Sequence, residues 1–197
     1  GDTLNSVIRA KIEELKSEDR IGTMQFFKCT LVMVEEVGGK DIPFSAITVE
    51  WLQKCEKLWS KTRSVSTIGM HMRNIRTLMN EAKRAGVIKE SQYPFGKGLF
   101  EIKTGIGRKK GLTKKQLKAI FDYKSGNETT NRYKDLWIFI YLCNGINPTD
   151  MLKLKFSDIV DGEICFVRQK TERTTKNRKE IRATISVQMQ ADRKSTR

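Results

Sequence analysis

The chain has 197 residues and a formal net charge of +15 at pH 7, with 38 Lys and Arg against 23 Asp and Glu. No apolar run approaches the roughly 20 residues that a membrane-spanning helix needs, and no charged-then-apolar leader opens the chain, so we expect a cytoplasmic protein. One histidine and four cysteines without a CxxC pair argue against a zinc site and favour reduced, buried thiols.

The positive charge is unevenly distributed. Residues 1–105 carry 17 Lys and Arg against 13 Asp and Glu, whereas residues 106–197 carry 21 against 10. A basic surface of this size favours a polyanionic partner, of which nucleic acid is the usual one. The alternative is a basic, solvated surface without a partner.

The first half of the sequence is typical of helices. Apolar residues recur at helical spacing over 4–15 and 24–37, and Gly38-Gly39 ends the second segment. Thr48 is the expected N-cap of a third helix. Its buried stripe consists of Val49, Leu52, Cys55 and Trp59.

A fourth helix is expected between Ser66 as N-cap and Gly86 as C-terminal stop. Its buried side consists of Ile68, Met72, Ile75, Met79 and Ala82. A second row contains Arg73, Arg76, Asn80 and Lys83. Three cations and an amide in one row could follow a phosphate backbone, although an ordinary solvated face has the same pattern.

The stretch 93–111, with five glycines and a basic cluster, is typical of a linker. After it, Thr113 is expected to cap a helix, residues 125–131 to form a loop, and Tyr133–Cys143 to form an apolar helix that buries Tyr133 and Tyr141. A further helix begins at Asn147, followed by two strands at 163–169 and 180–187 that form a hairpin with a basic tip. That further helix is expected to carry inward Met151, Leu152 and Leu154.

These segments resemble the tyrosine recombinase (phage integrase) family, especially integrases of bacterial mobile elements. "SVSTIGMHMRNIRTLMNEAKRAGVI" and "YPF" are similar to the end of the family's core-binding domain. "GLTKKQLKAI", "LWIFIYLCNGINPTDMLKLKFSDI" and "ICFVRQKTERT" are similar to the opening part of its catalytic domain.

The resemblance implies a mainly α chain with a small β-hairpin or sheet. A helical, SAM-like core-binding domain is expected at 1–104, a linker at 105–111, and a partial α+β catalytic domain at 112–197. It also implies a site-specific recombinase that, when complete, cuts and rejoins DNA through a 3′-phosphotyrosyl bond, without metal or cofactor. The missing His-x-x-Arg box and downstream tyrosine imply that the chain stops before the second half of the catalytic domain and does not cleave DNA itself.

Two positions match the family's catalytic pattern. Gly145, Asn147 and Asp150 align with a Gly-x-Arg-x-x-Glu pattern, so Asn147 stands where the family holds an arginine. Asn cannot supply a charged, bidentate fork, but it is a good helix N-cap, and a helix N-terminus can itself receive an anion. Lys170 resembles the hairpin lysine that protonates the leaving oxygen. Its alternative role is that of one phosphate-contacting or solvated cation among several.

The resemblance further implies double-stranded DNA as the partner, a location on the nucleoid, and a tetramer on DNA at full length. No membrane or small-molecule partner is expected. The expected phosphate contacts are Arg73, Arg76, Lys83, Arg108, Lys109, Lys110, Arg168, Arg173 and Lys176. The alternatives are a non-catalytic DNA-binding regulator or decayed recombinase and, from another class, an RNA-binding protein, which the absence of aromatic stacking signatures disfavours.

Overall fold

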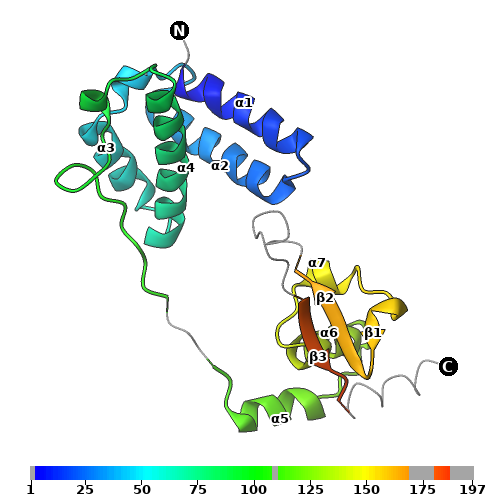
Figure 1. Cartoon of the computed structure of the whole chain (residues 1–197). Coiled ribbons are helices and arrows are strands. Elements are labelled where there is room, and N and C mark those ends of the chain that lie inside the picture. Colours follow the sequence, from blue (N-terminus) through cyan, green and yellow to red (C-terminus); the bar gives the residue numbers. More distant parts are fainter. Residues whose placement is uncertain (1–2, 108–110, 169–179, 187–197) are drawn as a thin grey trace. The chain divides into compact units, whose positions relative to one another are not determined.

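The computed structural model of the chain describes residues 3–107, 111–168 and 180–186 (Figure 1). The chain divides into two compact units, residues 1–109 and residues 110–197. The architecture is mainly helical with one small antiparallel sheet, which confirms the predicted fold class. The first unit contains α1 (Leu4–Ser17), α2 (Ile21–Gly38), the 3-10 helix η1 (Phe44–Ala46), α3 (Val49–Trp59), α4 (Val65–Arg84) and the 3-10 helix η2 (Glu90–Gln92).

Helix N-caps fix where α3 and α4 begin. The Thr48 hydroxyl accepts a hydrogen bond from the Trp51 amide at 3.2 Å, as predicted for α3. In α4 the cap is Ser64, whose hydroxyl accepts from the Thr67 amide at 3.2 Å. The prediction of Ser66 is therefore wrong by two residues, because both serines satisfy the local capping rule and only Ser64 has the extended backbone of a cap.

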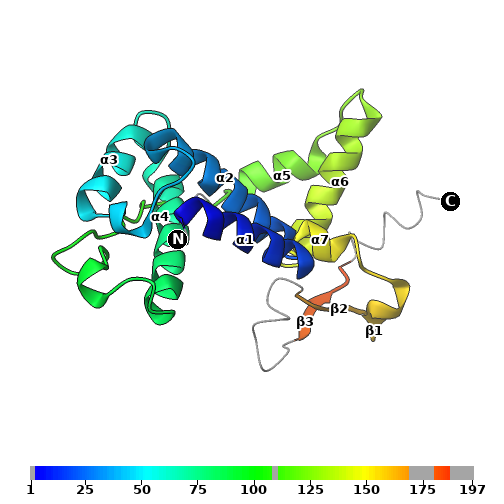
Figure 2. The same cartoon turned by 90° about the horizontal axis from the view of Figure 1, so that it is seen from above.

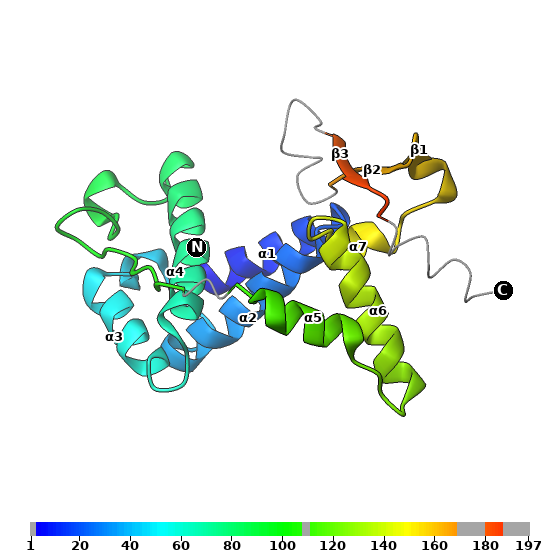
Figure 3. The same ribbon diagram turned by 90° about the horizontal axis from the view of Figure 1, so that it is seen from below.

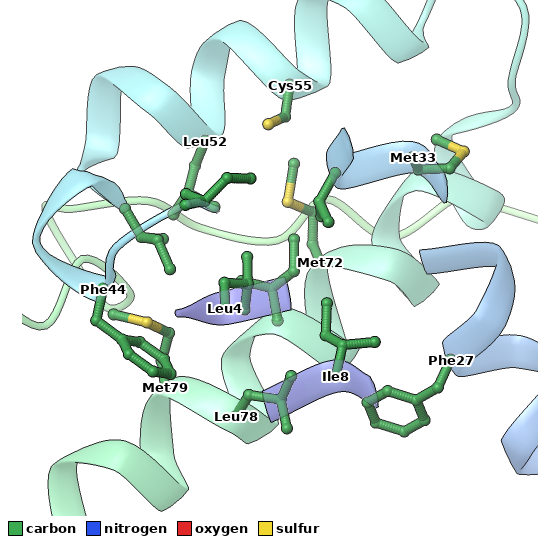
Figure 4. Close-up of a cluster of buried hydrophobic side chains, with 14 of the residues drawn as sticks. Leu4, Ile8, Phe27, Met33, Phe44, Leu52, Cys55, Met72, Leu78 and Met79 are labelled. Carbon is green, nitrogen blue, oxygen red and sulfur yellow. The ribbon is translucent and has the colours of Figure 1, made fainter. Parts of the chain in front are cut away.

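The core of the first unit is built by all four of its α-helices. Figure 4 shows Leu4 and Ile8 of α1, Phe27 of α2, Leu52 of α3 and Met72 of α4 converging on one cluster. Helices α1 and α2 lie side by side (Figures 1 and 2). The buried stripe predicted for α4 is confirmed.

All four cysteines are free thiols. Cys55, Cys143 and Cys165 are buried, and Cys29 is exposed. Burial raises the pKa of Cys55 to about 12 and that of Cys143 to about 11. These two thiols therefore stay protonated near neutral pH and pack as small apolar groups.

A polar network lies inside the first unit around His71, which is 3% exposed. Its Nδ1 lies 2.9 Å from Oγ1 of Thr30. That hydroxyl donates to the carbonyl of Phe26 at 3.0 Å and accepts from Nδ2 of Asn74 at 2.9 Å. Since the hydroxyl has only one proton to donate, Nδ1 of His71 must carry a proton and be the donor. Burial lowers the pKa of His71, which favours the neutral ring with its proton on Nδ1.

The chain leaves the first unit along α4. Residues 100–105, which we call the strap, pass very close to this helix. Glycine is therefore needed both on α4, at Gly69, and on the strap, at Gly105. A methyl group at Gly69 would lie 2.8 Å from the carbonyl oxygen of Lys103, and one at Gly105 would collide with Oγ of Ser66. The strap is therefore part of the folded unit.

The linker that glycine content predicts from residue 93 onward is wrong for residues 93–104, which belong to the folded first unit. Phe95 and Phe100 are buried with their ring centroids 5.9 Å apart, and Ile102 packs against the core. Glycine content favoured a flexible segment, but Gly105 of that segment lies where the chain passes close to Ser66 of α4.

The second unit places a three-stranded antiparallel sheet beside its helices (Figure 3). β2 lies between β1 and β3, with Cys165 of β2 opposite Arg182 of β3, so the predicted pair of strands is confirmed. A small core joins the sheet to α6 through Cys143, Ile146 and Ile164. The elements are α5 (Lys114–Asp122), α6 (Glu128–Leu142), α7 (Pro148–Met151), the 3-10 helix η3 (Phe156–Asp158), β1 (Ile159–Val160), β2 (Glu163–Val167) and β3 (Glu180–Thr184).

Three predictions for the second unit are wrong. Helix α6 begins at Glu128, within the predicted loop, because Asn127 caps it through the amides of the next residues. Tyr133 and Tyr141, predicted to be buried, are 69% and 46% exposed, and Leu152 is 81% exposed. The apolar residues of α6 surround most of the helix, and the sheet-side core and Phe121 of α5 cover only part of them.

Candidate nucleic-acid interface

The outer face of α4 presents two arginines. Arg73 and Arg76 are both exposed, one helical turn apart, on the side away from the buried stripe. The guanidinium of Arg73 lies beside Gly69, where an added methyl group would be 3.3 Å from Nη1. Two guanidinium groups in one row can each donate paired hydrogen bonds to phosphate oxygens.

Lys83, predicted to belong to the same row, has protein partners. Its Nζ lies 3.1 Å from the carboxylate of Glu90 and 4.4 Å from the ring centroid of Tyr93. Because Glu90 is 80% exposed, this ion pair contributes little to stability, on the order of 0–1 kcal/mol. The carboxylate nevertheless offsets the charge of Lys83, so within the predicted row Arg73 and Arg76 are better placed than Lys83 to meet an anion.

Lys97 was not predicted as a contact residue, but it lines a shallow hollow of about 460 Å³ together with Arg76. The available signal was the stretch Phe95-Gly-Lys-Gly-Leu-Phe100, in which two aromatic residues flank a lysine between glycines. Such a pattern fits an anchored loop with a basic tip as well as it fits a linker.

Lys103 of the strap also has a partner. Its Nζ lies 2.8 Å from Oε2 of Glu56 on α3. The ion pair joins the strap to α3, on the side of α4 where an apolar hollow of about 270 Å³ is lined by Val65, Met72 and Phe100. Because Lys103 is 67% exposed, this ion pair adds little to the packing of Phe100 and Ile102 that holds the strap.

In the second unit, Asn147 caps α7 as predicted. Its Oδ1 accepts from the Thr149 amide at 2.9 Å, Pro148 is the first helical residue, and the buried Asp150 lies in the first turn. Because its Oδ1 accepts this hydrogen bond, Asn147 acts as the N-cap that its sequence context predicts. Helix α7 is only one turn long, too short to form an anion site from its N-terminus.

The predicted hairpin cations are only partly described. Arg168 is exposed where β2 ends. Arg182 of β3 pairs with Glu180 at 3.0 Å and Glu163 at 3.5 Å. Outside the described residues lie Arg108, Lys109, Lys110, Lys170, Arg173 and Lys176.

Two features are absent from the described part of the chain. Its helices include none that is long and apolar enough to cross a membrane. Within the same residues, no group of three or more His, Cys, Asp or Glu side chains is placed to hold a metal ion.

Comparison with known proteins identifies the first unit. The family model described as phage integrase SAM-like domain matches residues 3–102. A comparison with curated proteins found no match. Among solved structures, the integrase of the Tn1549 transposon, in complex with a circular intermediate DNA, is similar with a TM-score of 0.70 and 13% sequence identity.

That similarity covers 100% of this chain and 66% of the integrase chain, so this chain spans about two thirds of the other's length. At this identity the structural match shows a shared fold. The SAM-like domain match, in contrast, spans more than half of the residues. The chain therefore belongs to the phage integrase family of tyrosine recombinases.

Proposed function

We propose that this chain is the DNA-binding portion of a site-specific integrase that contacts double-stranded DNA mainly through phosphates. The proposal rests on one observation: a phage integrase SAM-like domain exposes Arg73 and Arg76 in one row on α4. The high net charge of +15 supports it, because long-range attraction to DNA scales with such charge. Lys83, paired with Glu90, is expected to contribute less.

For the second unit we propose further phosphate contacts by Arg168 and by the cations outside the described residues, which are Arg108, Lys109, Lys110, Arg173 and Lys176. In the complete recombinase, Lys170 would act as the general acid that protonates the leaving sugar oxygen. Fixed cations around the scissile phosphate would stabilise the charge that develops in the transition state. The complete protein would work as a tetramer on DNA.

Duplex binding across a salt series tests the proposed function. If about four phosphates are contacted, affinity should fall about 100-fold between 50 and 200 mM salt, because each contact contributes a slope of about −0.9. Fluorescence anisotropy with a labelled duplex measures this slope, and a structured RNA competitor tests the preference for DNA. Binding that is insensitive to salt, or absent at low salt, would contradict the proposal.

A second candidate function is that of a non-catalytic regulator that occupies recombination sites. Asn147 favours it, because its side chain caps α7 at the position where the family holds an arginine. An amide cannot replace the paired, charged donors of a guanidinium. In a full-length version, Asn147→Arg tests this candidate: an unchanged recombination rate would mean that the position has no catalytic role.

Residues 1–197 are expected to form no covalent adduct with DNA. The four tyrosines, Tyr93, Tyr123, Tyr133 and Tyr141, all precede β2, whereas the family resemblance places the nucleophile well after the hairpin. A nicked suicide duplex analysed on a denaturing gel checks this. A shifted band that protease removes would contradict the prediction, and loss of that band in Tyr133→Phe would identify the most exposed of these tyrosines as the nucleophile.

A further inference from the structure

The hollow beside α4 brings two cations from different segments together. Arg76 comes from α4, and Lys97 from the loop that precedes the strap. The hollow has a volume of about 460 Å³ and is shallow and open to solvent. Its remaining lining residues are Gly96, Phe100, Glu101 and Ile102.

The loop that carries Lys97 is anchored at its base. The amide of Phe100 donates to the carbonyl of Pro94 at 2.9 Å, and the amide of Gly96 donates to the carbonyl of Phe100 at 3.2 Å. Both flanking aromatic rings, Phe95 and Phe100, are buried in the core of the unit. Lys97 therefore lies at the tip of a short turn whose ends are fixed.

The turn is open on its outer side. Gly96 and Gly98 have φ values of 146° and 78°, which side chains other than glycine rarely adopt. A methyl group added at either glycine would meet no atom within 4 Å. The glycines therefore serve the backbone conformation, and the space beside Lys97 is accessible to a ligand.

The charges of the hollow favour an anion. Arg76 and Lys97 supply two positive charges against one negative charge from Glu101. Oε1 of Glu101 accepts from the amide of Gly98 at 3.4 Å, a long contact that holds the carboxylate toward the turn. A guanidinium provides a directional fork and an ammonium a mobile point charge, and the two are complementary on one phosphate.

We infer that Arg76 and Lys97 together bind a single phosphate of the DNA backbone. This inference rests on the proposed function, since it assigns one contact within the DNA interface of the first unit. A phosphate held from two segments is fixed more firmly than one held from a single helix. The turn at residues 96–98 would therefore help to fix the position of the protein along the duplex.

Salt titrations of duplex binding by the full chain test the inference. Arg76→Ala and Lys97→Ala should each weaken binding about 3- to 10-fold at 100 mM salt, as expected for loss of a phosphate contact. The double variant should lower the magnitude of the salt slope by about 0.9, the value for one phosphate, and not by the roughly 1.8 expected for two. Lys16→Ala is the matched control, because Lys16 is 66% exposed in the same unit and does not line the hollow.

Two variants sharpen the result. Glu101→Gln should tighten binding, because it removes the negative charge from the hollow, and Lys97→Arg should retain most of the affinity. All five substitutions change exposed side chains, so melting temperatures are expected to stay within about 2 °C of the unsubstituted chain.

The outcomes separate the inference from the proposed function. If the unsubstituted chain binds no duplex at low salt, the proposed function fails and the inference fails with it. If the unsubstituted chain binds duplex with the expected salt dependence, but Lys97→Ala has the same affinity as Lys16→Ala, only the inference is overturned. A slope loss near 1.8 in the double variant would also overturn it, because the two cations would then contact separate phosphates.

Discussion

Trp59→Ala is expected to lower the free energy of unfolding of the first unit by about 3–5 kcal/mol, the range typical of large aromatic truncations in cores. Trp59 is 2% exposed, and its Nε1 donates to the carbonyl of Met33 at 3.2 Å. Its ring edge also packs against His71, with the centroids 6.1 Å apart. Since domains of this size are stable by about 5–15 kcal/mol, much of the unit's stability would be lost.

Urea unfolding followed by circular dichroism measures this effect. Trp59→Phe is the matched control: it keeps a ring against His71 while removing the indole N–H, so we expect less than half of the loss. A midpoint for Trp59→Ala equal to that of the unsubstituted chain would show that Trp59 does not support the core.

Gly69→Ala is expected to destabilise the first unit by about 1–3 kcal/mol, the usual cost of overpacking. The new methyl group would lie 2.8 Å from the carbonyl oxygen of Lys103, so the strap must move away from α4. The side chain of Arg73, at 3.3 Å, could yield more easily than backbone. Hydrogen exchange of the strap amides should therefore become faster, in addition to the loss of stability.

Gly22→Ala in α2 is the matched control for Gly69→Ala, and its expected effect on stability has the opposite sign. A methyl group there meets no atom within 4 Å, so alanine should stabilise the helix by up to about 1 kcal/mol. If Gly69→Ala were as stable as Gly22→Ala, the strap would not be held tightly against α4.

Features that depend on neighbouring residues could be predicted from the sequence. The caps Thr48, Thr113 and Asn147 each lie beside the amides that they bind, and the structure confirms all three. The buried stripe of α4 and the pair β2 and β3 follow from side-chain periodicity alone. Ser64 could not be distinguished from Ser66, because both offer the same local chemistry.

Features that depend on distant segments could not be predicted. Periodicity identifies the apolar residues of α6 but does not say what covers them, so the exposure of Tyr133 and Tyr141 was missed. The row on α4 correctly places Arg73 and Arg76 on the exposed face, yet Lys83 meets Glu90 from a later segment. Lys97 and Arg76 line the same hollow only because residues 94–100 fold into a turn beside α4, and their spacing in the sequence does not predict this.

Fastening the strap to α4 limits how far the two units can separate. Between Gly105 and the cap Thr113 the chain has only residues 106–112, which span at most about 25 Å when fully extended. If both units contact one duplex as proposed, a tether this short gives the second contact an effective concentration in the millimolar range. Cutting the chain after residue 105 should then weaken duplex binding strongly, because each unit would have to bind alone.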